Sequence, residues 1–144
     1  MPKHLVISTR FAEGLSFELA QTMKDKFVAA GLSCYNPNID MPKSDDWRGL
    51  FAAEIATAAE TQGCMIRLQL IGPFTTNQRW EQETADEKSC AVESVTIMAA
   101  ERGRSPHEQA NQVDEKGKWL ANGAGLKQPV PGVGTVEQQI QRII

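Results

Sequence analysis

Short apolar runs alternate with amphipathic stretches along most of this chain. The first apolar run, Leu5-Val-Ile7, ends in the polar residues Ser8-Thr-Arg10. In the stretches between the runs, apolar residues recur every three or four positions, which is the spacing of a helix face. The predicted strands are 5–7, 32–35, 65–71 and 92–99. The predicted helices are 13–30, a second that has N-cap candidates at 44–46 and ends at Gly63, a third over about 77–89, and a last one capped by Thr135.

Strands that alternate with amphipathic helices form a parallel sheet covered by helices on both faces. Right-handed crossovers then place helices on the two sides. The predicted fold class is therefore α/β, a three-layer flavodoxin-like domain with a central parallel sheet of four to five strands. Residues 36–42 and 129–134 are expected to be loops, 101–118 a long loop or a marginal helix, and 119–120 a short fifth strand or a packed turn. The whole chain, 1–144, is expected to form one domain.

Composition narrows the class of protein. The chain carries a net charge of −3, so a nucleic-acid partner is not expected. No apolar run approaches the roughly 20 residues that span a bilayer, so no membrane association is expected either. The three cysteines, Cys34, Cys64 and Cys90, are far apart, and the chain has only two histidines. This spacing argues against a metal site or a disulfide framework and favours a cytoplasmic protein.

Three polar loops are expected to meet at one edge of the sheet, because the carboxyl ends of parallel strands lie together. Arginine suits phosphate, aromatic rings suit a base, and a carboxylate suits ribose hydroxyls or a developing cation. This set of groups fits a nucleotide with a labile glycosidic bond. The candidate residues are Glu83 as the catalytic group, and Ser8, Arg10, Phe11, Asp40, Trp47, Phe74 and Trp80 as substrate-binding groups.

The residues alone leave alternatives open for several of these positions. Composition does not separate Glu83 from Glu81, and the acidic residues of this helix also fit a solvated face. Trp47 lies on the apolar stripe of its helix and fits the core as well as a cleft. Trp80 fits a packing role beneath the third helix.

Three short motifs carry a resemblance to a known family. They are Leu5-Val-Ile-Ser-Thr-Arg10, Ser44-Asp-Asp-Trp47 followed by an apolar helix, and Asn77-Gln-Arg-Trp80-Glu-Gln-Glu83. In order and spacing they resemble the strand-one signature, the BB loop and the third-helix box of TIR (Toll/interleukin-1 receptor) domains, particularly the bacterial-type, NAD-cleaving members. The resemblance covers about residues 4–98, and residues 99–144 show no signature of the family.

The resemblance implies a function and residue roles. It implies that NAD is the substrate, with no separate cofactor, and that the nicotinamide–ribose bond is cleaved by hydrolysis or cyclisation. Glu83 takes the catalytic position, Arg10 the phosphate-binding position, and Trp47 and Asp40 positions in or before the BB loop. Members of this family act in immune or cell-death signalling, so self-association and a separate effector protein are expected partners.

Two alternatives to this interpretation follow from the same motifs. The first is a non-enzymatic TIR interaction module, which is favoured by the three-residue spacing from Trp80 to Glu83 and by Asn77 in place of serine. The second is an enzyme that resembles nucleoside 2-deoxyribosyltransferases, a related architecture that also uses a glutamate on a helix to act on an N-glycosidic bond. The usual Asp-x-Gly-Thr-x-x-Glu box of those enzymes is not seen before Glu83.

Overall fold

Eleven helices and strands make up the part of the chain that the computed structural model describes, which comprises residues 2–8, 14–70, 76–97, 129–130 and 132–144. The strands are β1 (His4–Ser8), β2 (Ser33–Tyr35), β3 (Cys64–Leu70), β4 (Ala91–Ile97), β5 (Pro129–Val130) and β6 (Gly134–Thr135). The helices are α1 (Gly14–Ala29), α2 (Pro37–Asp40), α3 (Trp47–Glu60), α4 (Thr76–Glu87) and α6 (Val136–Ile143). None of the described helices is both long and apolar enough to cross a membrane.

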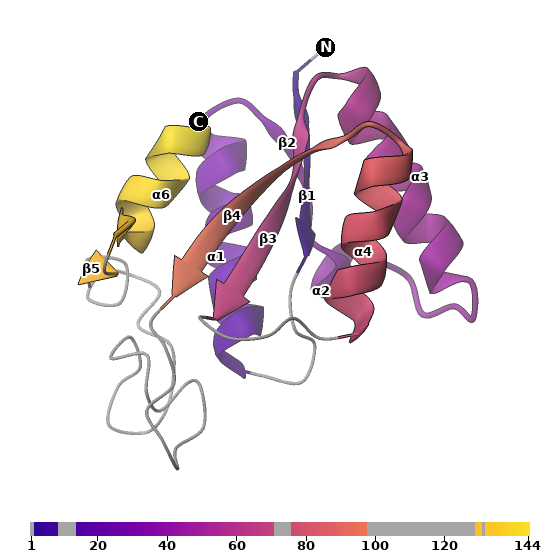
Figure 1. Ribbon diagram of the computed structural model, residues 1–144, viewed down its shortest axis with the longest axis horizontal. Coiled ribbons are helices and arrows are strands. Elements are labelled where there is room, and N and C mark those ends of the chain that lie inside the picture. Colours follow the sequence, from indigo (N-terminus) through magenta and orange to yellow (C-terminus); the bar gives the residue numbers. More distant parts are fainter. Residues whose placement is uncertain (1, 9–13, 71–75, 98–128, 131) are drawn as a thin grey trace.

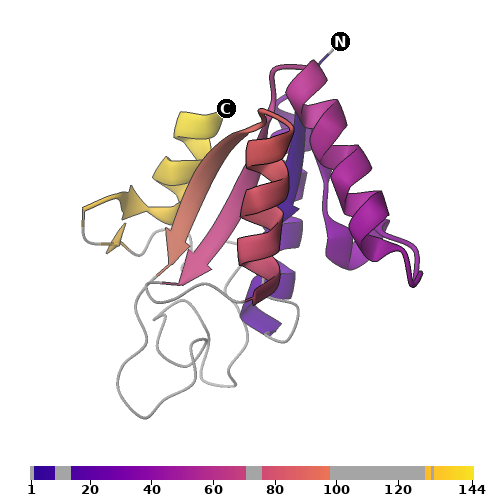
Figure 2. The same cartoon turned by 45° about the vertical axis from the view of Figure 1, so that its right-hand side comes forward.

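Four parallel strands form the central sheet in the order β2-β1-β3-β4 (Figure 1). Their carboxyl ends point toward the same edge, which is the lower edge in Figure 1. Helices α1 and α6 cover one face of the sheet, and α3 and α4 cover the other (Figure 2). The predicted α/β, three-layer flavodoxin-like fold is confirmed, with four strands in the parallel sheet.

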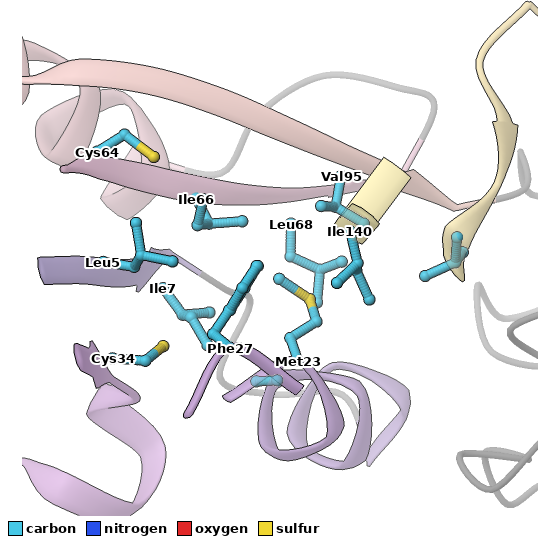
Figure 3. Packing of buried hydrophobic residues seen from close by; sticks show 12 residues of the cluster. Leu5, Ile7, Met23, Phe27, Cys34, Cys64, Ile66, Leu68, Val95 and Ile140 are labelled. Carbon is cyan, nitrogen blue, oxygen red and sulfur yellow. The ribbon is translucent and has the colours of Figure 1, made fainter. Parts of the chain in front are cut away.

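The core on the first face joins α1 and α6 to the sheet (Figure 3). Met23 and Phe27 of α1 are completely buried, as the four-residue spacing of that helix predicts, and they point toward the strand residues. Ile140 of α6 is also buried in this core and packs beside β4. An ion pair between Lys26 and Glu137, 3.7 Å from nitrogen to oxygen, also links the two helices.

The core on the second face holds α3 and α4 against the sheet. Phe51, Ile55 and Ala58 form the buried stripe of α3, and Ala85 comes from α4. The second predicted helix begins as expected, because α3 starts at Trp47 and Asp46, one of the predicted N-cap candidates, is its N-cap residue. The helix ends at Glu60, before the expected end at Gly63. Gly63 follows that helix and lies against the backbone of β1.

A short helix, α2, occupies residues that the sequence predicts to be loop. Pro37 occupies the first turn, where its missing N–H costs no hydrogen bond. The Asn36 side chain caps the helix by accepting a hydrogen bond from the Asn38 N–H at 3.2 Å. Pro-Asn patterns indicate a turn, and here the turn continues into a helix of one turn. The predicted loop 129–134 contains β5 and the first residue of β6, which form an antiparallel pair. The predictions for 101–118 and 119–120 lie outside the described residues.

The outer edge of β4 is partly covered by a side chain of α6. The amide group of Gln139 accepts a hydrogen bond from the Thr96 N–H at 2.7 Å and donates one to the Thr96 carbonyl at 2.9 Å. This pair of bonds reproduces what a neighbouring strand would supply. Gln139 is buried, so the two bonds attach α6 to the sheet edge.

The capping box of α6 gives a first testable prediction. Thr135 accepts a hydrogen bond from the Gln138 N–H at 3.0 Å, and the Gln138 side chain accepts one from the Thr135 N–H at 2.9 Å. Replacing Thr135 with alanine is expected to lower the free energy of unfolding by about 1 kcal/mol. Urea denaturation measures the loss. Thr57→Ala, in the interior of α3, is the control and should cost less, since Thr57 caps nothing; equal losses would contradict the capping role.

Candidate functional site

The strand order marks one position on the sheet as a natural ligand site. From β1 the chain adds β2 on one side and then β3 and β4 on the other side. In open α/β sheets, ligands bind outside the carboxyl ends of the strands at this switch point, between β1 and β3 in a flavodoxin-like order. Ser8 is the last residue of β1 and therefore lies at the switch point.

A buried carboxyl group lies directly against Ser8. The Ser8 hydroxyl donates a hydrogen bond to Oε2 of Glu81, which comes from α4. Ser8 is 0% exposed and Glu81 is 2% exposed. Helical spacing explains why Glu81 points inward, since Ala85 and Thr84, one turn along α4, are also buried.

Burial changes the acidity of this carboxyl group. Removal of Glu81 from water raises its pKa from 4.5 to about 7, and the hydrogen bond from Ser8 opposes that rise only in part. The group therefore changes its protonation state near neutral pH. A carboxyl group with a raised pKa at a ligand-binding edge is a candidate for proton transfer or nucleophilic attack.

A row of polar residues on the sheet fixes the position of α4. Ser8, Arg67 and Ser94 are register partners on β1, β3 and β4. The Arg67 guanidinium donates to Oε1 of Gln82 at 2.6 Å and to the Ser94 hydroxyl at 3.0 Å. Two successive residues of α4, Glu81 and Gln82, are thus hydrogen-bonded to the sheet. This double anchoring fixes the rotation of α4 about its axis and keeps the Glu81 carboxyl group against β1.

An aromatic cluster lies between the N-terminal halves of α3 and α4. The rings of Trp47 and Trp80 meet edge to face with centroids 5.4 Å apart, and Phe51 lies 5.9 Å from Trp80. The guanidinium of Arg48 lies 5.2 Å from the centroid of Trp47 and 5.3 Å from that of Trp80. These ring and cation–π contacts join the start of α3 to the turn of α4 that carries Glu81.

A cavity of about 520 Å³ lies between α2 and the start of α3. Its lining consists of two prolines, two other apolar side chains and three polar residues: Pro37, Asn38, Met41, Pro42, Lys43, Ser44 and Trp47. The volume falls within the range of about 300–1,000 Å³ that small-molecule sites occupy. Because α2 follows the carboxyl end of β2, the cavity opens at the same edge of the sheet as Ser8.

The structure brings some of the sequence-predicted site residues together. Ser8 lies at the switch point, Trp80 precedes Glu81 on α4, and Trp47 contacts Trp80 and lines the cavity. The sequence left open whether Trp47 lies in the core or in a cleft. In the structure Trp47 is half-buried, so it belongs partly to each. Arg10, Phe11 and Phe74 lie outside the described residues.

Asp40 is hydrogen-bonded to residues outside this group, and Glu83 is exposed on α4. Oδ2 of Asp40 accepts hydrogen bonds from Lys24 Nζ at 2.6 Å and from the Asn36 N–H at 2.8 Å. Asp40 therefore links α2 to α1 and stabilises the turn after β2. Glu83 is exposed on α4, because two residues along a helix turn a side chain about 200° away from Glu81.

Glu81 and Arg67 are the residues that the sequence reasoning did not select. The signal for Glu81 was its spacing from Ala85, which places the two on one face of the helix. The signal for Arg67 was a charged residue in the middle of an apolar strand, where a charge needs partners. In the described part of the chain, no group of three or more His, Cys, Asp or Glu side chains could hold a metal ion.

The fold and the buried acid together define a class: a three-layer α/β protein with a carboxyl group at the switch point of its sheet. Among solved structures, the chain is similar to a 2-deoxyribosyltransferase from the psychrotolerant bacterium Bacillus psychrosaccharolyticus. The TM-score is 0.52 at 11% sequence identity, and the match covers 84% of this chain and 92% of the transferase. A likeness at this identity establishes the shared fold. No family model matches the sequence, and no curated protein matches it.

This comparison overturns the expected family. The assignment to TIR domains is wrong, because the structural similarity is to a 2-deoxyribosyltransferase and no family model supports TIR membership. Cleavage of NAD and a place in immune signalling came with that resemblance and are overturned with it. The physical reason is that a polar loop after a buried strand, followed by an acidic helix, recurs across three-layer α/β folds. The self-association and the separate effector protein are untested and stay predictions, as does the lack of a cofactor, nucleic-acid partner or membrane partner.

Proposed function

We propose that this protein is an enzyme that cleaves the N-glycosidic bond of a nucleoside and transfers the sugar, as a deoxyribosyltransferase does. The observation that carries the proposal is the buried Glu81 carboxyl group, held by Ser8 at the switch point of the sheet. The fold shared with a 2-deoxyribosyltransferase supports the same class of reaction. The three cysteines are free thiols, which supports a location in the cytoplasm.

In the proposed reaction Glu81 acts as the nucleophile. Ser8 holds Oε2, so Oε1 attacks C1′ of the sugar while the bond from C1′ to the base nitrogen breaks. The electron pair of that bond leaves with the base, which takes up one proton. The positive charge that develops on the sugar is stabilised by the adjacent carboxylate. A second base then attacks C1′ through a ring nitrogen, the bond from C1′ to the Glu81 oxygen breaks, and Glu81 is released as a carboxylate. The second base gives up the proton of that nitrogen, which balances the proton taken up by the first base.

The test is an exchange assay with a pair of matched variants. The protein is incubated with a 2′-deoxynucleoside and a different free base, and the new nucleoside is measured by chromatography. Glu81→Gln is expected to abolish transfer, whereas Glu83→Gln, two residues along the same helix and exposed, should retain it. Full transfer by Glu81→Gln, or loss in Glu83→Gln alone, would refute the role of Glu81.

The pH dependence of the reaction gives a second testable prediction. A nucleophile must be ionised, so kcat/KM is expected to rise with pH and to reach its half-maximum near the Glu81 pKa of about 7. Ser8→Ala removes the hydrogen bond that lowers this pKa, so the half-maximum should move to higher pH. Initial rates from pH 5 to pH 9 measure the shift. A Ser8→Ala profile that moves to lower pH, or does not move, would show that Ser8 does not tune Glu81.

A further inference from the structure

The cavity between α2 and the start of α3 has a chemistry that suits a flat ring. Pro37 and Pro42 give it rigid walls, and Met41 and Trp47 add a polarisable side chain and an aromatic ring. Methionine and tryptophan both pack well against the faces of aromatic rings. Small-molecule sites are typically apolar in this way, with a few polar groups that fix the orientation of the ligand.

The polar groups of the lining can pair with the edge of a heterocycle. Asn38 brings a side-chain amide, which contains both a donor and an acceptor, and Ser44 brings a hydroxyl. The Ser44 oxygen accepts a hydrogen bond from the Asp46 N–H at 3.1 Å, and its own O–H proton can still be donated. A nucleobase presents donors and acceptors on the edge of a planar, uncharged ring, and amide side chains pair with such edges.

The cavity is connected to Glu81 through aromatic contacts. Trp47 lines the cavity and meets the ring of Trp80 edge to face, with centroids 5.4 Å apart. Trp80 immediately precedes Glu81 on α4. On the other side, α2 packs against β1, which ends at Ser8, and Figure 1 shows α2 beside the carboxyl end of that strand. The cavity and the carboxyl group therefore share one edge of the sheet and one set of supporting residues.

We infer that this cavity binds the nucleobase of the substrate, with Trp47 stacked on the base and Asn38 and Ser44 hydrogen-bonded to its edge. The inference rests on the proposed function, since it places the leaving and incoming bases of the same transfer reaction. It implies that Trp47 controls affinity for the base and that Glu81 controls the chemical step. The two roles can be measured separately.

The test measures the binding of free adenine and free cytosine by equilibrium dialysis, in the absence of any sugar donor. Trp47→Ala is expected to weaken base binding by about fivefold or more, because stacking of a base on an aromatic ring contributes about 1–3 kcal/mol and each 1.4 kcal/mol is tenfold in affinity. Trp47→Phe, which keeps an aromatic ring, should retain most of the affinity. Glu81→Gln should bind the bases as the parent protein does, since the carboxyl group is not needed to hold them.

A second variant tests the same cavity in case Trp47→Ala does not fold. Ser44 is exposed at the rim, so Ser44→Trp should fill the cavity without disturbing the core, and it should block base binding. The matched control is Glu93→Gln at a separate cavity of about 170 Å³ between β4 and α6, where base binding should not change. Circular dichroism confirms that each variant folds.

The outcomes separate this inference from the proposed function. Base binding that depends on Trp47 and Ser44, without any sugar transfer, would support the base site and refute the transferase. A different result would overturn the base site and leave the transferase in place. In that result the protein transfers the sugar, and both the affinity for the base and the KM for the base are unchanged in Trp47→Phe, Trp47→Ala and Ser44→Trp. No detectable binding of either base by the parent protein would also overturn the base site.

Discussion

Glu81→Gln is expected to be more stable than the parent protein above pH 7, by about 3 kcal/mol. Burial raises the pKa of Glu81 from 4.5 to about 7, and each pKa unit corresponds to 1.36 kcal/mol. Below pH 4.5 the carboxyl group is protonated in both the folded and unfolded states, so it adds no pH dependence. Between pH 4.5 and 7 the unfolded chain loses this proton and the folded protein keeps it, so stability falls as the pH rises. Above pH 7 the buried carboxylate lowers the free energy of unfolding of the parent protein by the full amount of about 3 kcal/mol.

Urea denaturation at pH 5 and pH 8 measures this effect. The difference in the free energy of unfolding between Glu81→Gln and the parent should be small at pH 5 and should grow toward about 3 kcal/mol at pH 8. Glu83→Gln is the matched control on the same helix and should show no such growth, since Glu83 is exposed. A Glu81→Gln difference that is equal at the two pH values would mean that the folded protein does not hold this carboxyl group out of water.

Gly63→Ala is expected to cause the largest loss of stability among single-methyl additions in the described chain. A Cβ at Gly63 would overlap the carbonyl oxygen of His4 and lie 2.8 Å from its carbonyl carbon and 2.9 Å from its nitrogen. These are backbone atoms of β1, which is hydrogen-bonded to a strand on each side, so they cannot move aside. The expected loss is about 3 kcal/mol or more, at the upper end for overpacking in a core.

Thermal and urea denaturation of Gly63→Ala should be compared with Gly31→Ala. Gly31 has φ of +86° after α1 and nothing within 4 Å of an added Cβ, so alanine there meets only the cost of a left-handed conformation, about 1–2 kcal/mol. A Gly63→Ala loss no larger than that of Gly31→Ala would show that β1 and β3 can separate locally. The pair distinguishes a steric conflict between strands from a backbone effect at one residue.

The sequence predicted the strands and helices well where the apolar period was strong. Met23 and Phe27 fall on the buried face of α1, and the Thr135 cap lies at the expected residue. The sequence did not predict α2, because a helix of four residues has no period to detect and depends on the Asn36 cap and the Pro37 ring. It also assigned Gly63 to stopping a helix, whereas tertiary packing against β1 requires the glycine.

The sequence placed the candidate site at the carboxyl edge of the sheet with Glu83 as its catalytic group, and that assignment stays a prediction. The structure adds that Glu81 is buried whereas Glu83 is exposed. Glu81 and Glu83 look alike in a run of acidic residues, and only the rotation of α4 decides which of them is buried. The rotation of α4 is set by Arg67 of β3, through the hydrogen bond from Arg67 to Gln82. The spacing of Glu81 from Ala85 is a local signal that favours Glu81, but the contact that fixes the rotation joins residues 15 positions apart in the chain and is not contained in a local motif. The predicted roles of Arg10, Phe11 and Phe74 remain predictions.

The two hydrogen bonds between Gln139 and Thr96 also limit how this protein can associate. A bare edge strand offers its backbone to any other extended chain, which is how sheets grow between molecules and begin to aggregate. At Thr96 both outward groups of β4 are already occupied by a side chain, so a foreign strand cannot continue its ladder past that point. Among the described residues, a single glutamine amide thus takes the place that a further strand would occupy beside Thr96 and works against extension of the sheet into an assembly.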